Sequence, residues 1–305
     1  MTADSRPPSG AASVTDTESS PATTARRAAP QSLLTRVFKS PRIVISSLFL
    51  VLIGLISLAA PLVAPQDPTQ LLAKPLLEPS AEYPLGTDDF GRDALSRLIY
   101  AGRISLGVSV SSVVIATLVG VWLGLLAGYF GGWADTLIMR AMDLLLSFPT
   151  IVLAIAIVAM LGASLTNLVL VIAIVYIPRF VRIVYGATLG IRELEFVMAA
   201  RVAGATDLRI LRLAVLPNVL TPIMVQFSLS LGFAILVETG LSFLGLGAQP
   251  PTPSWGNMVA AARPFMETNT WLLLAPAAAV GLTILTLNTL GDGLRDLLDP
   301  RMART

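Results

Sequence analysis

The sequence has 305 residues, of which 54% are hydrophobic and 13% are charged, and its mean hydropathy is +0.77. These values exclude an ordinary soluble domain and predict an all-α polytopic membrane protein. The chain has no Cys and no His, which excludes disulfides, His-dependent metal sites and Ser-His or Cys-His catalysis. We therefore expect neither a metal site nor a catalytic site. The net charge of only +2 makes the placement of the charges more informative than their sum.

Six apolar runs predict six transmembrane helices, since a bilayer core of about 30 Å needs about 20 helical residues. They cover roughly residues 43–64, 104–127, 144–161, 167–184, 219–241 and 271–290. Residues 1–42 form a predicted disordered cytoplasmic tail, rich in Ser, Thr, Ala and Pro as far as residue 32. The remaining predicted parts are an extracytoplasmic loop with a short helix at 65–103, a core of five transmembrane helices at 104–291, and a cytoplasmic tail at 292–305.

The distribution of Lys and Arg predicts the orientation of these spans, because cytoplasmic segments carry an excess of both residues. With the N-terminus inside, sixteen of the 21 Lys and Arg residues fall in cytoplasmic segments and five outside. We therefore expect both termini in the cytoplasm. The same orientation places the polar stretch 195–218 on the cytoplasmic side.

Residues 195–218 form the longest strongly polar interruption of the hydrophobic part, and they predict a helix, a corner and a second helix. Gly204 supplies a left-handed stop, Thr206 can cap the second helix, and Pro217 fits a first-turn position. Small side chains allow another surface to approach closely, whereas three arginines keep the element in water or headgroups. The small side chains are Ala199, Ala200, Ala203 and Ala205, and the arginines are Arg201, Arg209 and Arg212. The pattern indicates a docking element.

The spacing resembles the Glu-Ala-Ala loop of ATP-binding-cassette (ABC) importer permeases, which seats a cytoplasmic ATPase. Ala199, Ala200, Gly204, Leu216 and Pro217 match the family pattern. Met198 stands where the family has Glu, and Ala214 stands where it has Ile. The resemblance implies a set of ATPase-coupling residues, namely Glu195, Met198, Ala199, Ala200, Gly204, Ala205, Thr206, Asp207, Leu208, Leu216 and Pro217.

A second motif precedes the second span: Pro84-Leu-Gly-Thr-Asp-Asp-Phe-Gly-Arg-Asp-Ala-Leu-Ser-Arg97. Thr87 or Asp88 can cap a short helix, and Asp89, Arg92 and Asp93 can pair along its exposed side. The motif resembles the dipeptide and oligopeptide "C" subunits of the permease family, although Tyr83 replaces their usual His. By this resemblance the candidate contacts for a binding protein are Asp88, Arg92, Asp93 and Trp255. A solvated helix that makes no substrate contact is an open alternative.

Candidates for the substrate pathway are Glu238, Ser242 and Asp143. Glu238 is the only carboxylate well inside a predicted span, and an intramembrane ionisable residue is costly enough to indicate function. Structural pairing with a neighbouring helix is the open alternative for Glu238. The run from Glu238 to Met258 and the tail from Gly291 to Arg301 also resemble the peptide branch, so the resemblance covers roughly residues 84–301.

The chain lacks a Walker A loop, because neither Lys39 nor Lys74 follows a Gly-rich stretch. We therefore expect no enzymatic activity and no bound cofactor, with ATP and Mg²⁺ used by separate ATPase subunits. The resemblance implies the type I ABC importer permease fold and peptide import across a bacterial cytoplasmic (inner) membrane. It implies as partners a second homologous permease in a heterodimer, two ATPase subunits or one fused ATPase, an extracytoplasmic binding protein and membrane lipid, but no nucleic acid. Import of nickel or another small solute is the alternative, and a secondary transporter or channel is a further one.

Overall fold

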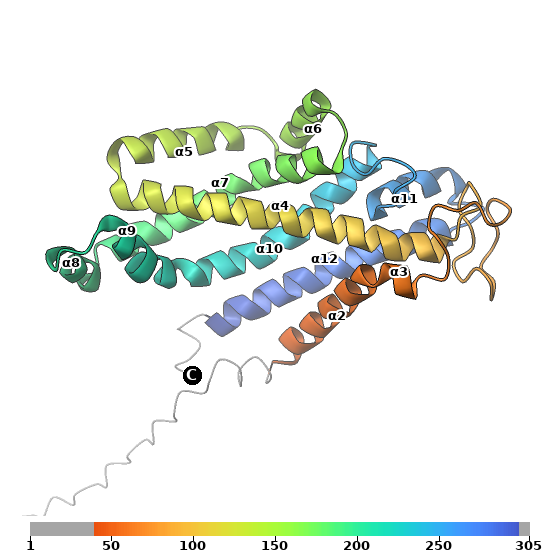
Figure 1. The fold of residues 1–305 in the computed structure, drawn as a ribbon, viewed down its shortest axis with the longest axis horizontal. Helices are drawn as coiled ribbons and strands as arrows, with labels where there is room; N and C mark the ends of the chain where they lie inside the picture. The colour runs from red at the N-terminus through yellow and green to blue at the C-terminus, as the bar shows by residue number, and fades with distance from the viewer. Residues whose placement is uncertain (1–39, 299–305) are drawn as a thin grey trace, which may run out of the picture. The chain divides into compact units, whose positions relative to one another are not determined.

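The computed structural model describes residues 40–298, which are helical apart from turns, loops and one isolated bridge between Thr87 and Asp93 (Figure 1). The elements in chain order are α2 (Pro41–Leu58), α3 (Ala60–Val63), α4 (Ala94–Phe130), α5 (Gly132–Leu146), α6 (Thr150–Leu161), α7 (Leu165–Arg192), α8 (Glu195–Val202), α9 (Asp207–Ile210), the π-helix η1 (Leu211–Val215), α10 (Leu216–Phe243), α11 (Trp255–Ala262), the 3₁₀-helix η2 (Arg263–Phe265) and α12 (Trp271–Leu298). The predicted all-α class is confirmed. The termini beyond these limits, which hold most of the two predicted tails, lie outside the described residues.

Among the described residues, five helices are long and apolar enough to cross a membrane: α2, α4, α7, the continuous helix Asp207–Phe243 and α12. A sixth crossing needs α5 and α6 together, and these two helices meet at a bend of 92°. The third predicted span, 144–161, is therefore not one straight helix, and it bends at Ser147-Phe148-Pro149, as this sequence predicts. Pro149 precedes α6 with an extended backbone, and a residue before proline is itself disfavoured in the α conformation, so Ser147-Phe148-Pro149 breaks the helix.

Three other predicted boundaries also differ from the structure. The first predicted span is interrupted at Ala59, where α2 gives way to the short α3. The short helix predicted within 65–103 is instead the beginning of α4, which starts at Ala94 with Asp93 as its N-cap. The helix α12 continues to Leu298, so the first part of the predicted C-terminal tail is helical.

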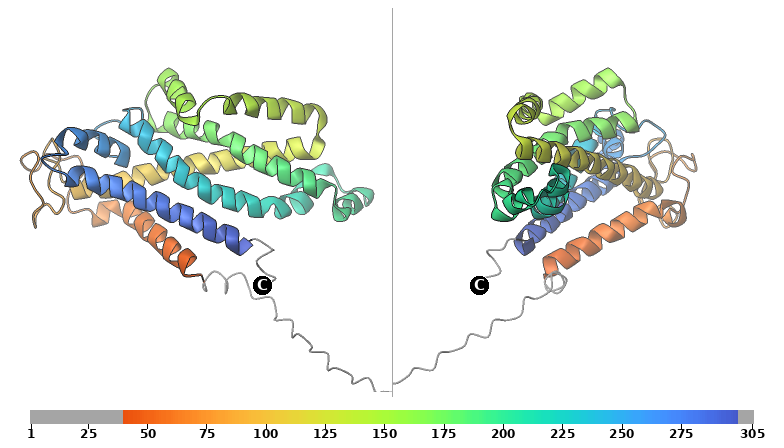
Figure 2. Two further views of the ribbon diagram at one scale, coloured as in Figure 1. Left: turned by 180° about the vertical axis from the view of Figure 1, so that it is seen from behind. Right: turned by 60° about the vertical axis from the view of Figure 1, so that its left-hand side comes forward.

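The longest shared interface joins α4 and α7, which lie side by side in Figures 1 and 2. Three glycines spaced four residues apart on α4 allow this approach. A Cβ added at Gly120 would lie 2.5 Å from Cβ of Phe180, one at Gly124 2.7 Å from Cβ of Val184, and one at Gly128 2.7 Å from Cβ of Thr188. Small residues at this spacing let helix backbones pack closely within a membrane.

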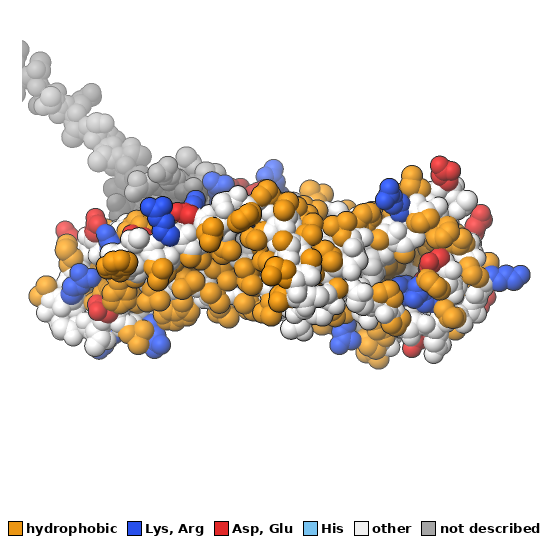
Figure 3. All heavy atoms as spheres, turned by 90° about the horizontal axis from the view of Figure 1, so that it is seen from above, with side chains coloured by type: hydrophobic (Ala, Val, Ile, Leu, Met, Phe, Trp, Pro, Cys, Tyr) orange, Lys and Arg blue, Asp and Glu red, His pale blue; other side chains and the backbone are white. Residues whose placement is uncertain are grey.

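The outer surface of the helices is strongly apolar. Leu48 on α2, Leu118 on α4 and Leu285 on α12 are each more than half exposed. Figure 3 shows apolar side chains covering the middle of one face, with most of the charged side chains toward its two ends. An exposed apolar band between two charged ends fits a lipid bilayer better than water.

The elements that carry the predicted sites lie at opposite ends of the long helices (Figures 1 and 2). The helices α8 and α9 lie beside the C-terminal end of α4. The loop 65–93 and α11 lie beside its N-terminal end. The long helices therefore separate the predicted docking element from the second motif by the length of α4.

Candidate functional site

The stretch Glu195–Asn218 contains the predicted helix, corner and second helix, formed by α8 and the start of the Asp207–Phe243 helix. Gly204 ends α8 with a positive φ of 79°. The amide of Ala205 donates to the carbonyl of Ala200 at 3.1 Å, and the amide of Gly204 donates to the carbonyl of Arg201 at 3.0 Å. This pair of hydrogen bonds is the Schellman motif, whose left-handed position favours glycine.

The second helix begins and continues differently from the prediction. Thr206 occupies the N-cap position of α9, but its side chain makes no capping hydrogen bond. Pro217 lies in the first turn of α10, which continues directly from the π-helix Leu211–Val215. Pro217 has no amide hydrogen to donate within this continuous helix, and it directly follows the π-helix, where the hydrogen-bond register of the helix changes.

The corner is fixed to the rest of the chain through Tyr129, the penultimate residue of α4. The Tyr129 hydroxyl donates to Oδ1 of Asp207 at 2.8 Å, and the guanidinium carbon of Arg201 lies 5.4 Å from the centre of the Tyr129 ring. Val197 from α8 and Ile210 from α9 are buried in the same apolar cluster as Tyr129. Tyr129 therefore connects the C-terminal end of α4 to both short helices of the corner.

The outward face of the corner combines small and large apolar side chains. Phe196, Met198, Val202 and Leu208 are 45%, 51%, 90% and 50% exposed. Among the predicted coupling residues, Glu195, Met198, Ala199, Gly204, Thr206, Asp207, Leu208 and Pro217 are exposed, and Ala200, Ala205 and Leu216 are half-buried. A protruding apolar patch of this kind is typical of a protein–protein contact.

Phe196, Val202 and Tyr129 belong to this site but were not among the predicted residues. The i, i+4 spacing of Met198 and Val202 places both on one side of α8, so helical periodicity could have identified Val202. Tyr129 lies 78 residues before Asp207 in the chain, and no local pattern indicates that the two meet.

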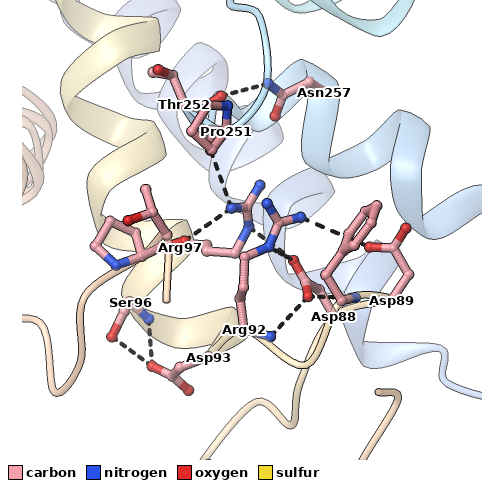
Figure 4. A network of polar contacts seen from close by, with 12 residues as sticks. Asp88, Asp89, Arg92, Asp93, Ser96, Arg97, Pro251, Thr252 and Asn257 are labelled. Atoms are coloured by element: carbon pink, nitrogen blue, oxygen red, sulfur yellow. Dashed lines mark hydrogen bonds and ion pairs between the residues drawn. The ribbon is translucent and has the colours of Figure 1, made fainter. Parts of the chain in front are cut away.

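At the opposite end, Asp88, Arg92 and Arg97 form an ion-pair cluster that we call the arginine clamp (Figure 4). Oδ2 of Asp88 accepts from Nε of Arg92 at 2.7 Å and lies 3.2 Å from Nε of Arg97. The side chains of Arg92 and Arg97 are only 11% and 8% exposed, so the Asp88 carboxylate pairs with two nearly buried cations. Asp89 adds a second negative charge, with its Oδ1 3.9 Å from Nη2 of Arg92. Burial and the adjacent charge of Asp88 raise the pKa of Asp89, whereas Arg92 opposes this shift.

The arginine clamp joins three segments that are distant in sequence. Nη1 of Arg97 donates to the carbonyl oxygens of Pro68 at 3.0 Å and Pro251 at 3.3 Å. The amide and hydroxyl of Ser96 donate to Oδ2 of Asp93 at 2.8 and 2.6 Å (Figure 4). These bonds hold the loop 65–93 and the segment before α11 against the start of α4.

This geometry corrects the predicted roles of the second motif. Asp93 is fully buried and Arg92 is 9% exposed, so they do not pair along an exposed helix side. Trp255 is 1% exposed, and its indole Nε1 donates to the carbonyl of Leu98 at 3.2 Å. Asp93 and Trp255 therefore hold the fold together from within and present no free surface to a partner. Asp88 is partly exposed, and whether it contacts a partner stays a prediction.

Glu238 is fully buried among the packed helices, and among the described residues its Oε2 has no hydrogen-bond partner. Its Oε1 accepts from the hydroxyl of Ser242 at 2.8 Å, and both side chains are buried. The neighbouring α11 packs closely here, since a Cβ at Gly256 would lie 2.7 Å from Cβ of Ser242. This arrangement favours the structural alternative for Glu238 and Ser242. Asp143, by contrast, is half exposed and pairs with Nη2 of Arg182 at 2.6 Å.

Replacing Glu238 with glutamine is expected to leave assembly and transport near wild type, because the amide oxygen can still accept from Ser242. Glu238→Leu should lower stability by about 1–3 kcal/mol, since it leaves the buried Ser242 hydroxyl without its partner. Thermal unfolding in detergent and solute uptake in proteoliposomes measure the two effects. If Glu238→Gln retained the wild-type melting temperature but lost uptake, Glu238 would belong to the pathway after all.

The fold and its exposed apolar surface define a class of protein: an α-helical protein that crosses a membrane several times. The sequence profile of the family described as "Binding-protein-dependent transport system inner membrane component" matches residues 120–304. The chain belongs to this family. It is therefore the membrane component of an ABC importer that works with ATPase and substrate-binding partners.

Several known proteins are similar to this chain. The di/tripeptide transport system permease protein DppC of Pseudomonas aeruginosa is 47% identical over 84% of this chain and 86% of its own length. The glutathione transport system permease protein GsiD of Pectobacterium atrosepticum is 47% identical over 73% of this chain and 74% of its own length. A chain of the inward-facing MetNI methionine ABC transporter matches the fold with a TM-score of 0.53 at 16% identity, over 67% of this chain and 97% of its own. This match confirms the predicted type I ABC permease fold.

Proposed function

We propose that this chain is the permease subunit of an ATP-driven importer for dipeptides or oligopeptides. The observation that carries the proposal is the 47% identity to a di/tripeptide permease over 84% of the chain. The same similarity favours a second, homologous permease as the partner in the membrane and a binding protein that delivers the peptide. Glutathione is itself a small peptide, so the similarity to GsiD supports the same substrate class over nickel or another small solute.

The exposed corner supports a mechanism of coupling to separate ATPase subunits. An ATPase that contacts Met198, Val202 and Leu208 would push on α8 and α9, and Tyr129 would pass the displacement to α4. Because α4 packs along α7 through its glycine stripe, the two helices would move together. Such rocking would alternate the pathway between inward-open and outward-open states. A secondary transporter or channel has no ATPase subunit to dock, so it would not explain the exposed apolar corner.

The proposed function is tested by reconstitution. Proteoliposomes that contain this chain, its sister permease, the ATPase subunits and the binding protein should take up a labelled dipeptide only when ATP is inside. The purified chain alone should show no ATPase turnover, because it lacks a Walker A loop. Uptake without ATP, or ATP hydrolysis by the chain alone, would contradict the proposal.

We also propose that the corner and both termini face the cytoplasm and that the arginine clamp faces outward, as the distribution of Lys and Arg predicts. The chain has no Cys, so single cysteines report orientation cleanly. Val202→Cys, at a position 90% exposed, should resist a membrane-impermeant thiol reagent in intact cells, whereas exposed Glu267→Cys should be labelled. The reverse labelling pattern would overturn the orientation.

A further inference from the structure

A cavity of about 490 Å³ lies among α2, α4, α10 and α12, away from both sites described above. Its volume is within the range of about 300–1,000 Å³ typical of ligand sites. Most of its lining is apolar, including Ile53 and Leu58 from α2, Leu106 from α4 and Ile235 from α10. Gly54 and Gly107 also line it, and a Cβ built at either would meet no atom within 4 Å. The absence of side chains at Gly54 and Gly107 therefore leaves this part of the cavity open.

Arg103 gives this cavity a charged rim. It lies nine residues after the start of α4, about 14 Å along the helix at 1.5 Å per residue, immediately before the predicted apolar run. Within residues 40–298, no carboxylate lies within 4.0 Å of its guanidinium group. Arg92 and Arg97, on the same side of the molecule, both pair with Asp88. Arg103 is thus an exposed cation at the edge of the hydrocarbon region, beside an apolar hollow.

From this juxtaposition we infer that the cavity holds one acyl chain of an anionic phospholipid whose phosphate is bound by Arg103. A guanidinium group binds phosphate oxygens through paired hydrogen bonds, and its position at a span boundary matches the depth of lipid headgroups. The apolar lining would bind the acyl chain, and the positive charge of Arg103 would favour an anionic headgroup over a neutral one. A bound lipid of this kind would fill the space between α2 and the remaining spans.

The inference is tested on the assembled importer in nanodiscs that contain a photoactivatable phosphatidylglycerol with its reactive group on the acyl chain. Cross-links are expected in peptides that cover residues 50–58 of α2 and 106–111 of α4. Arg103→Gln should reduce their yield by about fivefold, the effect of about one cation at a lipid surface. Gly107→Leu should also reduce them, because its side chain narrows the cavity while Arg103 is kept.

Two matched variants control for charge and for bulk. Arg263→Gln removes another exposed cation from the same end of the molecule, and Gly186→Leu adds the same side chain at an exposed helical glycine outside the cavity. Both should cross-link like wild type. Three outcomes would overturn the inference: no cross-links to α2 and α4, equal yields from a phosphatidylcholine probe, or loss of the sister permease from the Gly107→Leu complex. The last result would show that a protein segment, and not a lipid, occupies the cavity.

Discussion

Gly124→Leu is expected to prevent the chain from folding in the membrane. A Cβ at this position would already lie 2.7 Å from Cβ of Val184 and 2.8 Å from the carbonyl oxygen of Val181, and both neighbours belong to α7. Backbone atoms cannot move away as a flexible side chain can, so α4 and α7 would have to separate. Overpacking typically costs about 1–3 kcal/mol, and we expect the upper end of this range or more because the clash lies in the longest helix interface.

Gly186→Leu is the matched control for this prediction, because it adds the same side chain to an exposed position of α7 with open space around it. Size-exclusion chromatography of a fluorescently tagged chain in detergent measures the folded fraction. Gly124→Leu should give aggregated or degraded protein, and Gly186→Leu should give a wild-type profile. A monodisperse Gly124→Leu protein with an unchanged melting temperature would show that the α4–α7 contact tolerates separation.

Gly204→Asp is expected to leave the chain folded but to abolish the coupling of ATP hydrolysis to solute uptake. The positive φ of 79° makes any side chain at this position strained by about 1–2 kcal/mol. Apart from its chain neighbours, no atom of residues 40–298 lies within 4 Å of a Cβ built there, so the new side chain would not clash with this part of the subunit. It would instead project from the exposed corner toward a docked partner. Loss of ATPase subunits, or hydrolysis without uptake, is the expected result.

Tyr129→Phe separates docking from transmission. It keeps the ring under Arg201 and removes only the hydroxyl that donates to Asp207. The ATPase subunits should therefore remain bound, while uptake per ATP hydrolysed falls. Subunit stoichiometry and the two rates distinguish this result from that of Gly204→Asp. If Tyr129→Phe showed the wild-type uptake per ATP hydrolysed, the hydrogen bond from Tyr129 to Asp207 would not be needed for coupling.

The sequence predicted most of the elements that depend on local chemistry. Long apolar runs predicted where the five long helices lie, although α4, α7 and α12 extend well beyond the predicted limits. Gly204 predicted the left-handed corner because few other residues accept that backbone conformation. Ser147-Phe148-Pro149 within the apolar run 144–161 also predicted the bend of the third span, although not its angle of 92°.

The burial of the second motif, residues 84–97, could not be predicted from the sequence. Charged residues at helical spacing predicted an exposed, paired helix side, yet Arg92 and Asp93 are buried. Arg97 of the same motif meets the carbonyl groups of Pro68 and Pro251 only after the chain folds. The same limit applies to Tyr129 and Asp207, and to the ion pair between Asp143 and Arg182. Contacts between distant segments are not encoded in the spacing of either segment.

The central claim is that partner ATPases act on this subunit through the corner at Gly204. The most direct measurement is the number of dipeptides taken up per ATP hydrolysed in proteoliposomes, compared between Gly204→Asp and Gly190→Asp. Gly190 is an exposed glycine near the end of α7 with open space and no positive φ, so it controls for the added charge and bulk. We predict a ratio near zero, or lost ATPase subunits, for Gly204→Asp and a wild-type ratio for Gly190→Asp. Wild-type stoichiometry, hydrolysis and uptake in Gly204→Asp would contradict it.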